Sequence, residues 1–226
     1  MTLSKPTTNT IADAMPSIQL LVRDWSENKT QIEITKINKF LSDLAHHLQD
    51  SKGTIDTAYL ESAEAKKILE RTIEIGIHEN EPQKSGLLFL FLTNFLDLRF
   101  SGDKNKQQIL TILKKITSIQ AAILRDTAEW LTLAYGRDVV QQSTDYKPEN
   151  NEQSFVGYIM ESIVALFTRL TIETVAAHLD ALVEMGGFDI ANNGNEIQHF
   201  GQTGRGFKPT KLGLQLLGYL RVFKTV

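Results

Sequence analysis

His46 and His47, followed by Asp50, are the residues whose types come closest to a metal site or a general-base cluster. They fall in a segment with helical periodicity. Neighbouring positions on a helix diverge by about 100°, so two adjacent histidines of one helix cannot converge on a single ion. We therefore expect a solvated histidine pair here and no metal site.

His178, Asp180 and Glu184 share another predicted helix, but they lack the i, i+4 spacing with which two helical side chains hold one metal ion. The segment GQTGRG at 201–206 suggests a phosphate-binding loop, yet it lacks the GK[ST] ending and no helix follows it directly. No Gly-x-Ser-x-Gly, HExxH or paired-acid motif occurs. The sequence therefore predicts a non-enzymatic protein without catalytic, cofactor-binding or metal-binding residues. Residues far apart in a chain can converge in a fold, so an enzyme remains an alternative.

The charge of the chain is distributed unevenly. The last thirty residues, Ile197 to Val226, contain five basic side chains and no carboxylate. The other residues hold 19 of the 24 Lys and Arg and all 27 Asp and Glu, so a formal charge of −8 faces a tail of +5. Fields of opposite sign favour different ligands or each other, which points to a binding partner. The basic side chains of the tail are Arg205, Lys208, Lys211, Arg221 and Lys224.

The composition is that of a folded protein: 226 residues, 42% apolar and 23% charged, can bury one large core or two small ones. The chain has no cysteine, which excludes disulfides, a thiolate zinc site and a cysteine nucleophile. The polar N-terminus lacks the apolar core of a secretory signal, so we expect a cytoplasmic protein. The most apolar segment, Leu87 to Phe100, is shorter than the roughly 20 residues that span a bilayer, and we expect a buried central helix.

Helical periodicity dominates the first 136 residues. Thr30 and Glu33, like Thr117 and Gln120, have the spacing of a capping box, in which two side chains satisfy free backbone groups at the start of a helix. The helix after Thr30 places five apolar side chains on one stripe: Ile37, Phe40, Leu41, Leu44 and Leu48. We expect helices at about 11–25, 30–53, 59–78, 82–102, 106–116 and 117–136.

We expect an all-α protein, mainly a helical bundle, with a small C-terminal part that contains a short β-hairpin. Residues 137–153 are polar and carry Pro148, with few apolar groups to offset the entropy of ordering, which indicates a linker. The sequence therefore predicts a helical bundle domain at 1–136 and a second domain at 154–226.

The second domain begins with two predicted helices, one at 155–170 and one that Thr171 caps. Turn-forming clusters rich in Asn and Gly then flank the alternating run 197–200. This pattern predicts a hairpin or ribbon with Arg205 at its tip. A last helix starts at Thr210.

This order of elements resembles the end of a winged helix domain. In that family a leucine-rich helix and a glycine lead into a two-stranded wing, and an aromatic-x-x-Thr-x-x-Gly step returns to a closing helix. The matching residues are Leu179, Leu182, Gly187, Phe188, Phe207, Thr210 and Gly213. The whole layout, helices followed by such a module, also resembles bacterial proteins of the abortive-infection alpha type, which implies a role around phage infection or other mobile elements. Neither resemblance brings catalytic residues.

In a winged helix domain, one helix enters a DNA groove. The resemblance implies that the helix after Thr171 corresponds to it. Its predicted exposed face carries Glu173, Asp180 and Glu184 beside His178, and it contains no Arg or Lys. Affinity for DNA depends on neutralising phosphates, and base recognition relies mostly on Arg, Lys, Asn and Gln. This face is therefore unsuited to groove insertion.

We expect a non-enzymatic protein that binds another protein or assembles with itself, using the acidic helix face and the basic wing and tail. An alternative is a nucleic-acid-binding regulator that contacts phosphates through Arg205, Lys208 and Lys211. A third hypothesis is a membrane-active effector that releases the Leu87 to Phe100 helix. No cofactor is expected.

Overall fold

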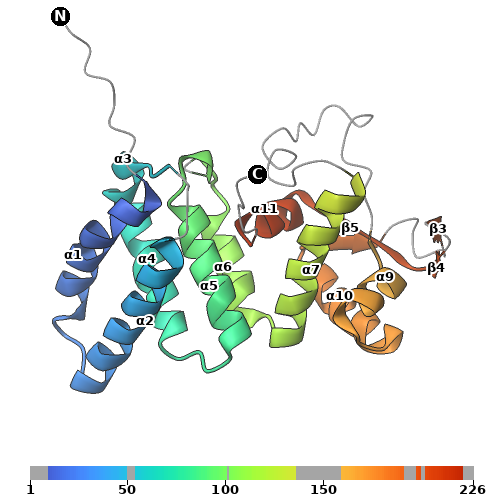
Figure 1. Cartoon of the computed structure of the whole chain (residues 1–226), viewed down its shortest axis with the longest axis horizontal. Helices are drawn as coiled ribbons and strands as arrows, with labels where there is room; N and C mark the ends of the chain where they lie inside the picture. Colours follow the sequence, from blue (N-terminus) through green and yellow to red (C-terminus); the bar gives the residue numbers. More distant parts are fainter. Residues whose placement is uncertain are drawn as a thin grey trace, which may run out of the picture. The chain divides into compact units, whose positions relative to one another are not determined.

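The computed structural model describes residues 10–49, 54–100, 102–135, 159–190, 197–199 and 202–220. These residues are mainly helical, with short strands in the C-terminal part, which confirms the expected fold class (Figure 1). They divide into two compact units. Those up to Leu110 belong to unit 1, and those from Thr111 belong to unit 2.

Unit 1 is built from helices. Its elements are η1 Ile11–Ala14, α1 Met15–Ser26, α2 Gln31–Gln49, α3 Thr57–Leu60, α4 Ala63–Gly76, α5 Pro82–Phe95, η2 Leu98–Phe100 and the first half of α6 Lys106–Lys115. At the start of α2 the backbone N of Thr30 donates to Glu33 Oε2 at 2.9 Å, and the N of Glu33 donates to Thr30 Oγ1 at 3.3 Å, so the predicted capping box is confirmed. The predicted apolar stripe of α2 is also buried.

The single helix expected at 59–78 is two helices, α3 and α4. Ser62 separates them, because its Oγ accepts from the backbone N of Ala65 at 3.1 Å and caps α4. Asp56 caps α3 in the same way through Tyr59 N at 2.9 Å. Two side chains that satisfy free helix donors thus start a second helix inside a periodic segment.

Helix α5 forms the centre of unit 1, as its apolar sequence predicted. It contacts α2 and α4, and Phe91 and Phe95 are fully buried. An all-round apolar helix is stable in water when neighbouring helices cover it. Among the helices that the structure describes, none has both the length and the hydrophobicity to cross a lipid bilayer.

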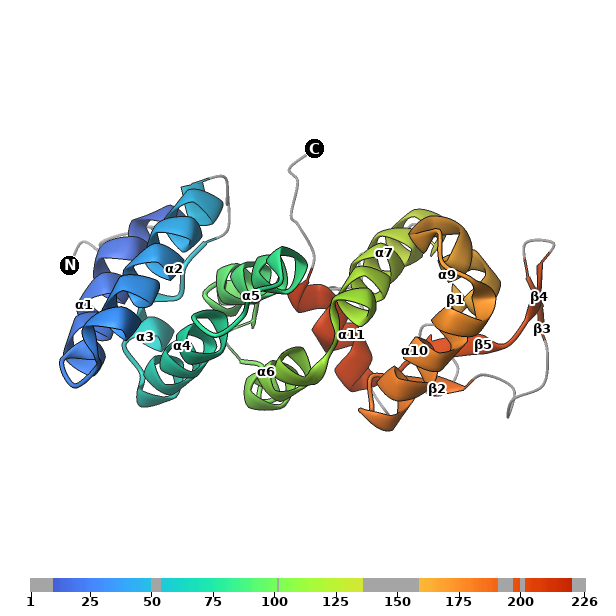
Figure 2. The same ribbon diagram turned by 90° about the horizontal axis from the view of Figure 1, so that it is seen from below.

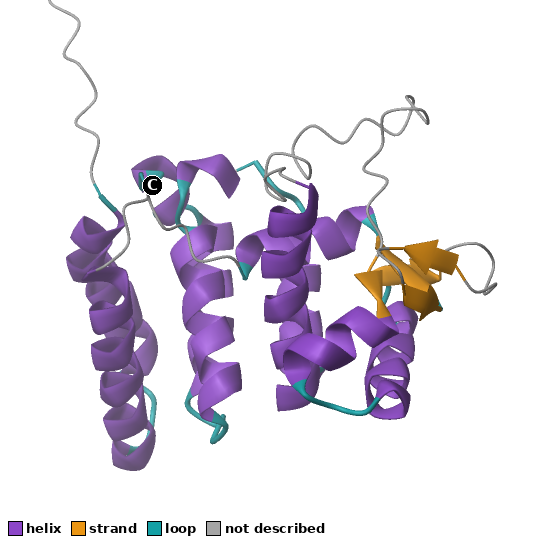
Figure 3. Cartoon of the chain, turned by 45° about the vertical axis from the view of Figure 1, so that its right-hand side comes forward, coloured by secondary structure: helices purple, strands orange, loops and turns teal. Residues whose placement is uncertain are grey.

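Unit 2 combines helices with a small antiparallel sheet (Figures 2 and 3). Its elements are the second half of α6, α7 Ser118–Tyr135, β1 Ile159–Met160, α9 Glu161–Thr168, α10 Ile172–Glu184, β2 Phe188–Ile190, β3 Ile197–His199, β4 Gln202–Gly204, β5 Gly206–Pro209 and α11 Lys211–Tyr219. In the sheet, β5 lies between β1 and β2 and is antiparallel to both. β3 and β4 form a separate hairpin, which confirms the predicted one.

Strand β1 corrects the expectation of a helix over 155–170. Ile159 and Met160 pair with Phe207 and Gly206 of β5, and α9 begins only at Glu161. Two apolar residues before an apolar helix carry no strand periodicity of their own. Pairing with a distant strand decides their conformation.

The chain divides earlier than the boundary at 136 that the sequence suggested. Helix α7, which the sequence assigned to the first domain, contacts α9, α10 and α11 and is part of unit 2. The predicted linker at 137–153 lies outside the described residues. A polar segment therefore does not mark the division between the units, because the helix before it packs with the helices after it.

A close backbone contact joins the end of α10 to the start of α11. Gly186 has a φ of 78°, the left-handed conformation that glycine adopts without steric cost. Thr210 Oγ1 donates to the carbonyl oxygen of Gly186 at 2.7 Å and accepts from the backbone N of Gly213 at 2.9 Å. A Cβ at position 213 would overlap the carbonyl group of Gly187. The Thr-x-x-Gly part of the motif thus caps α11 and fastens it to α10.

We expect Gly213→Ala to lower the free energy of unfolding by about 2–3 kcal/mol, because the obstacle to the new methyl group is backbone and cannot rotate away. Urea unfolding followed by circular dichroism measures the change. Gly86→Ala in α5 is the matched control, since its Cβ meets no atom within 4 Å and should stabilise the helix by about 0.5–1 kcal/mol. Equal stability of Gly213→Ala and the wild type would contradict the contact.

Candidate functional site

Arg205 lies between β4 and β5 and binds two carboxylates of unit 2. Its Nε donates to Glu161 Oε2 at 3.1 Å, and its terminal nitrogens donate to the two oxygens of Asp180 at 3.0 and 3.2 Å. The guanidinium also lies over the ring of Phe207, 5.2 Å from the centroid. Hydrogen bonding to Asp180, helped by the charge of Glu161, raises the pKa of Arg205 above its ordinary value. We call Arg205, Glu161 and Asp180 the arginine cluster.

This position corrects the expectation that Arg205 stands at the tip of the hairpin. His199 pairs with Gln202 at the closed end of the hairpin and Ile197 pairs with Gly204 at its base, and Arg205 follows directly after this base. Figures 1 and 2 show the hairpin at one end of unit 2, next to β5 and α9. The glycines around position 205 suggested a turn, whereas the strand register places them where β4 passes into β5. The guanidinium therefore ties the base of the hairpin to α9 and α10.

The outward face of α10 is acidic, as the sequence predicted. Glu173 and Glu184 are exposed, with Ala177 exposed between them, and α10 contains no Lys or Arg. Asp180 lies on the same side and is bound by Arg205. In the part of the chain that the structure describes, Glu173 and Glu184 form no ion pair. We call the exposed surface formed by Glu173, Ala177 and Glu184 the α10 face.

Two large apolar side chains are exposed where α9 turns into α10. Leu166 is 71% exposed and Ile172 is 47% exposed. Arg169, in the turn between them, has a φ of 58°, a left-handed conformation that residues other than glycine rarely adopt. Ile172 directly precedes Glu173, and an exposed apolar side chain beside an exposed acid suits a partner that brings both apolar groups and positive charge.

The other basic residues of the tail are placed separately. Lys208 is half-buried on β5, opposite Asp189 of β2, where facing opposite charges stabilise a sheet. Lys211 is exposed at the start of α11. Arg221 and Lys224 lie outside the described residues.

A buried cation in unit 1 was missed from the sequence. Lys106, the first residue of α6, is fully buried, and its Nζ lies 3.8 Å from the centroid of the Tyr59 ring. Burial lowers the pKa of Lys106, and the nearby charges of Glu64, Asp103 and Asp56 act against this shift. Burial likewise raises the pKa of Tyr59. A lysine at the start of a helix is a weak signal, because most such lysines are solvated.

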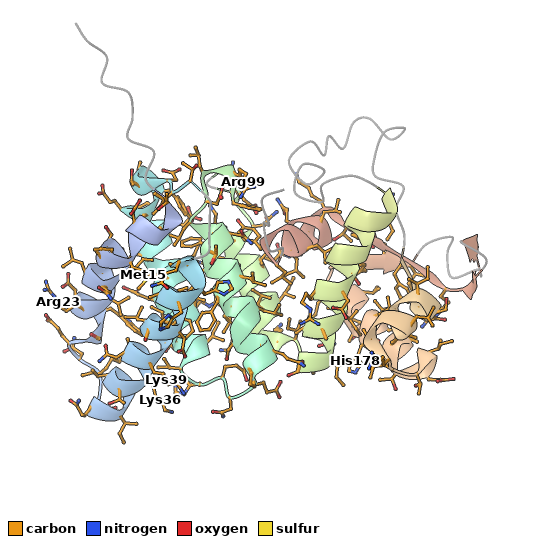
Figure 4. All side chains as sticks on the ribbon, in the orientation of Figure 1. Met15, Arg23, Lys36, Lys39, Arg99 and His178 are labelled. Atoms are coloured by element: carbon orange, nitrogen blue, oxygen red, sulfur yellow. The ribbon has the colours of Figure 1, made fainter. Side chains whose placement is uncertain are left out.

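The histidines considered from the sequence are dispersed. His46 is exposed, and His47 is half-buried with its ring centroid 6.0 Å from that of Phe89. Asp50 lies outside the described residues. His178 is half-buried on the flank of α10 (Figure 4). Among the described residues, no three His, Cys, Asp or Glu side chains are placed to hold one metal ion.

Comparison with the models of known protein families, with curated proteins and with solved structures finds no match to this chain.

We expect Arg205→Ala to lower the free energy of unfolding by about 1–2 kcal/mol, because it leaves two neighbouring carboxylates without their cation. The loss is limited since the Arg205 side chain is 31% exposed and solvent screens the charges. Arg205→Lys should recover part of it, as an ammonium group lacks the fork that binds Asp180. Arg125→Ala, which removes a 55%-exposed pair with the adjacent Asp126, should cost at most about 0.5 kcal/mol. Equal costs in urea unfolding would disprove a structural role of the arginine cluster.

Lys106 makes stability depend on pH. Its lowered pKa means that the folded chain binds fewer protons than the unfolded chain as the pH rises toward the ordinary value of 10.5, so this group adds stability with rising pH. We expect Lys106→Met to lack that increase. The unfolding free energy of the wild type minus that of the variant should therefore rise from neutral pH to about pH 10. Both proteins should carry Tyr59→Phe, because the raised pKa of Tyr59 has the opposite effect at higher pH. Lys104→Met controls for the loss of a cation, and a constant difference would contradict the assignment.

Proposed function

We propose that this chain is a non-enzymatic protein-interaction module, in which the winged-helix-like unit 2 binds another protein, or a second copy of the chain, through the α10 face. The winged-helix part of the proposal is supported by the order of elements. Among the residues that the structure describes, a helix, a strand, two helices, a strand, a hairpin and a strand occur in this order from α7 to β5, and the return strand β5 lies between β1 and β2.

The charge of the α10 face is the observation that carries the protein-binding part. Glu173 and Glu184 are exposed on the helix that would enter a DNA groove, and no cation stands beside them on that helix. Phosphates would be repelled there, whereas Lys and Arg side chains of a protein would be attracted. Exposed Ile172 and Leu166 add apolar area, which favours a protein partner further.

The alternative of a nucleic-acid regulator has less support than the sequence suggested. It depended on Arg205, Lys208 and Lys211, and Arg205 is bound by Glu161 and Asp180. A salt-sensitive shift of duplex or single-stranded probes, lost in Arg205→Glu with Lys208→Glu, would favour this alternative over protein binding.

The test is a charge reversal on the α10 face. We expect Glu173→Lys with Glu184→Lys to weaken both self-association, measured by light scattering, and the capture of host proteins on the immobilised chain. At about 500 mM NaCl the wild type should bind less than at about 50 mM, because salt screens exposed charges. Glu61→Lys with Glu74→Lys, two exposed acids of unit 1, is the matched control and should leave binding unchanged. Equal binding by both double variants would refute the proposal.

A further inference from the structure

We infer that this chain pairs with a second copy of itself at the point where α9 turns into α10, two helices that contact each other in unit 2 (Figure 2). We call the exposed surface formed by Leu166, Arg169, Ile172 and Glu173 the α9–α10 patch. The inference rests on the proposed function, because the patch includes Glu173 of the α10 face, and it names the partner.

The α9–α10 patch contains one cation and one acid, each of which can serve the other in a second copy. Arg169 and Glu173 are both exposed, and neither forms an ion pair with a described residue. Four positions of chain separate them, so their Cα atoms lie at most about 14 Å apart. A two-fold axis between them places each arginine opposite the glutamate of the other copy. Two equal ion pairs then join the copies.

The patch also contains apolar groups on which the copies can meet. Leu166 is 71% exposed and Ile172 is 47% exposed. Contact between two copies removes these side chains from water, an attraction that salt does not screen. The α10 face calls for a partner that brings apolar groups and positive charge, and the patch of a second copy brings both. An interface of so few residues is small, so we expect a weak dimer.

The backbone of Arg169 favours a role for its side chain outside the monomer. This residue directly follows α9 and has a φ of 58°, at a position where glycine is common because it has no Cβ. The left-handed conformation is unfavourable for arginine. Its side chain forms no hydrogen bond or ion pair with the described residues that would offset this cost. A contact with a second copy accounts for an arginine here.

Arg169→Gly separates folding from pairing. Glycine adopts the left-handed conformation readily, so the midpoint of urea unfolding should be unchanged or higher. The variant should nevertheless dimerise at least about threefold more weakly than the wild type, because both ion pairs across the axis are lost. Sedimentation equilibrium between about 10 µM and 1 mM of the full chain covers the range of a weak dimer. Unchanged dimerisation of this variant would contradict the inference.

A charge exchange tests the reciprocal pairing itself. The two variants are Glu173→Arg and Arg169→Asp, with aspartate chosen because it tolerates the left-handed conformation better than most residues. Each variant alone should dimerise about tenfold more weakly than the wild type, since like charges meet twice across the axis. An equimolar mixture should regain dimers, because each acid again faces an arginine. The variant with both substitutions should dimerise by itself.

Residues of unit 1 supply matched controls. Leu166→Ala should weaken dimerisation about threefold through the lost apolar contact, whereas Ile32→Ala, at a side chain that is 72% exposed, should leave it unchanged. Lys36→Asp and Glu61→Arg, which reverse exposed charges, should also leave it unchanged. Circular dichroism of every variant shows whether it remains folded.

The outcomes separate this inference from the proposed function. A wild type that stays monomeric over the whole range, or folded variants whose mixture fails to regain dimers, overturns pairing through the α9–α10 patch. If Glu173→Lys with Glu184→Lys then still loses captured host proteins, the proposed function stands with another partner. If both dimerisation and capture persist in that variant, the inference and the proposed function fail together.

Discussion

The close approach of Gly213 to Gly187 is the constraint on which the arrangement of unit 2 depends. Because no side chain stands between them, Thr210 can bond the end of α10 and start α11 against it. Strand β5 ends directly before Thr210. Phe207 of β5 is buried, and β5 lies between β1 and β2. The register of β5 in turn sets the residue before it, Arg205, between the carboxylates of α9 and α10. A backbone contact thus determines which charges of the surface are paired and which remain available.

Spatial neighbours, not sequence neighbours, decide what a charged residue does here. Arg205 belongs to a tail without carboxylates, yet it binds Glu161, 44 positions away, and Asp180, 25 positions away. Together, the arginine cluster and the α10 face contain four acids and one base, a net charge of −3 for this set of residues. The arginine therefore reduces the negative field at α10 without reversing it, and a surface that repels phosphate remains.

The parts of the fold that follow from local rules could be predicted from the sequence, and those that depend on distant partners could not. Helical periodicity located the stripe of α2 and the buried α5, and cap chemistry located Thr30. The two residues of β1 become a strand because β5 lies beside them. Lys106 and the site of Arg205 were missed for the same reason, since burial and pairing of a long cation depend on residues brought together by folding.

Lys106 of unit 1 and Arg205 of unit 2 differ in what surrounds them, and this difference is why the proposed function lies in unit 2. Lys106 has an aromatic ring beneath it and acids nearby, so its charge is compensated inside unit 1 and leaves no exposed group for a partner. The arginine cluster is compensated in a similar way, but the same helix α10 also carries Glu173 and Glu184, which form no ion pair with any described residue. An arrangement of helices and strands does not dictate what is bound. Because α10 carries exposed acids and no Lys or Arg, its outer face favours a basic partner surface over phosphate.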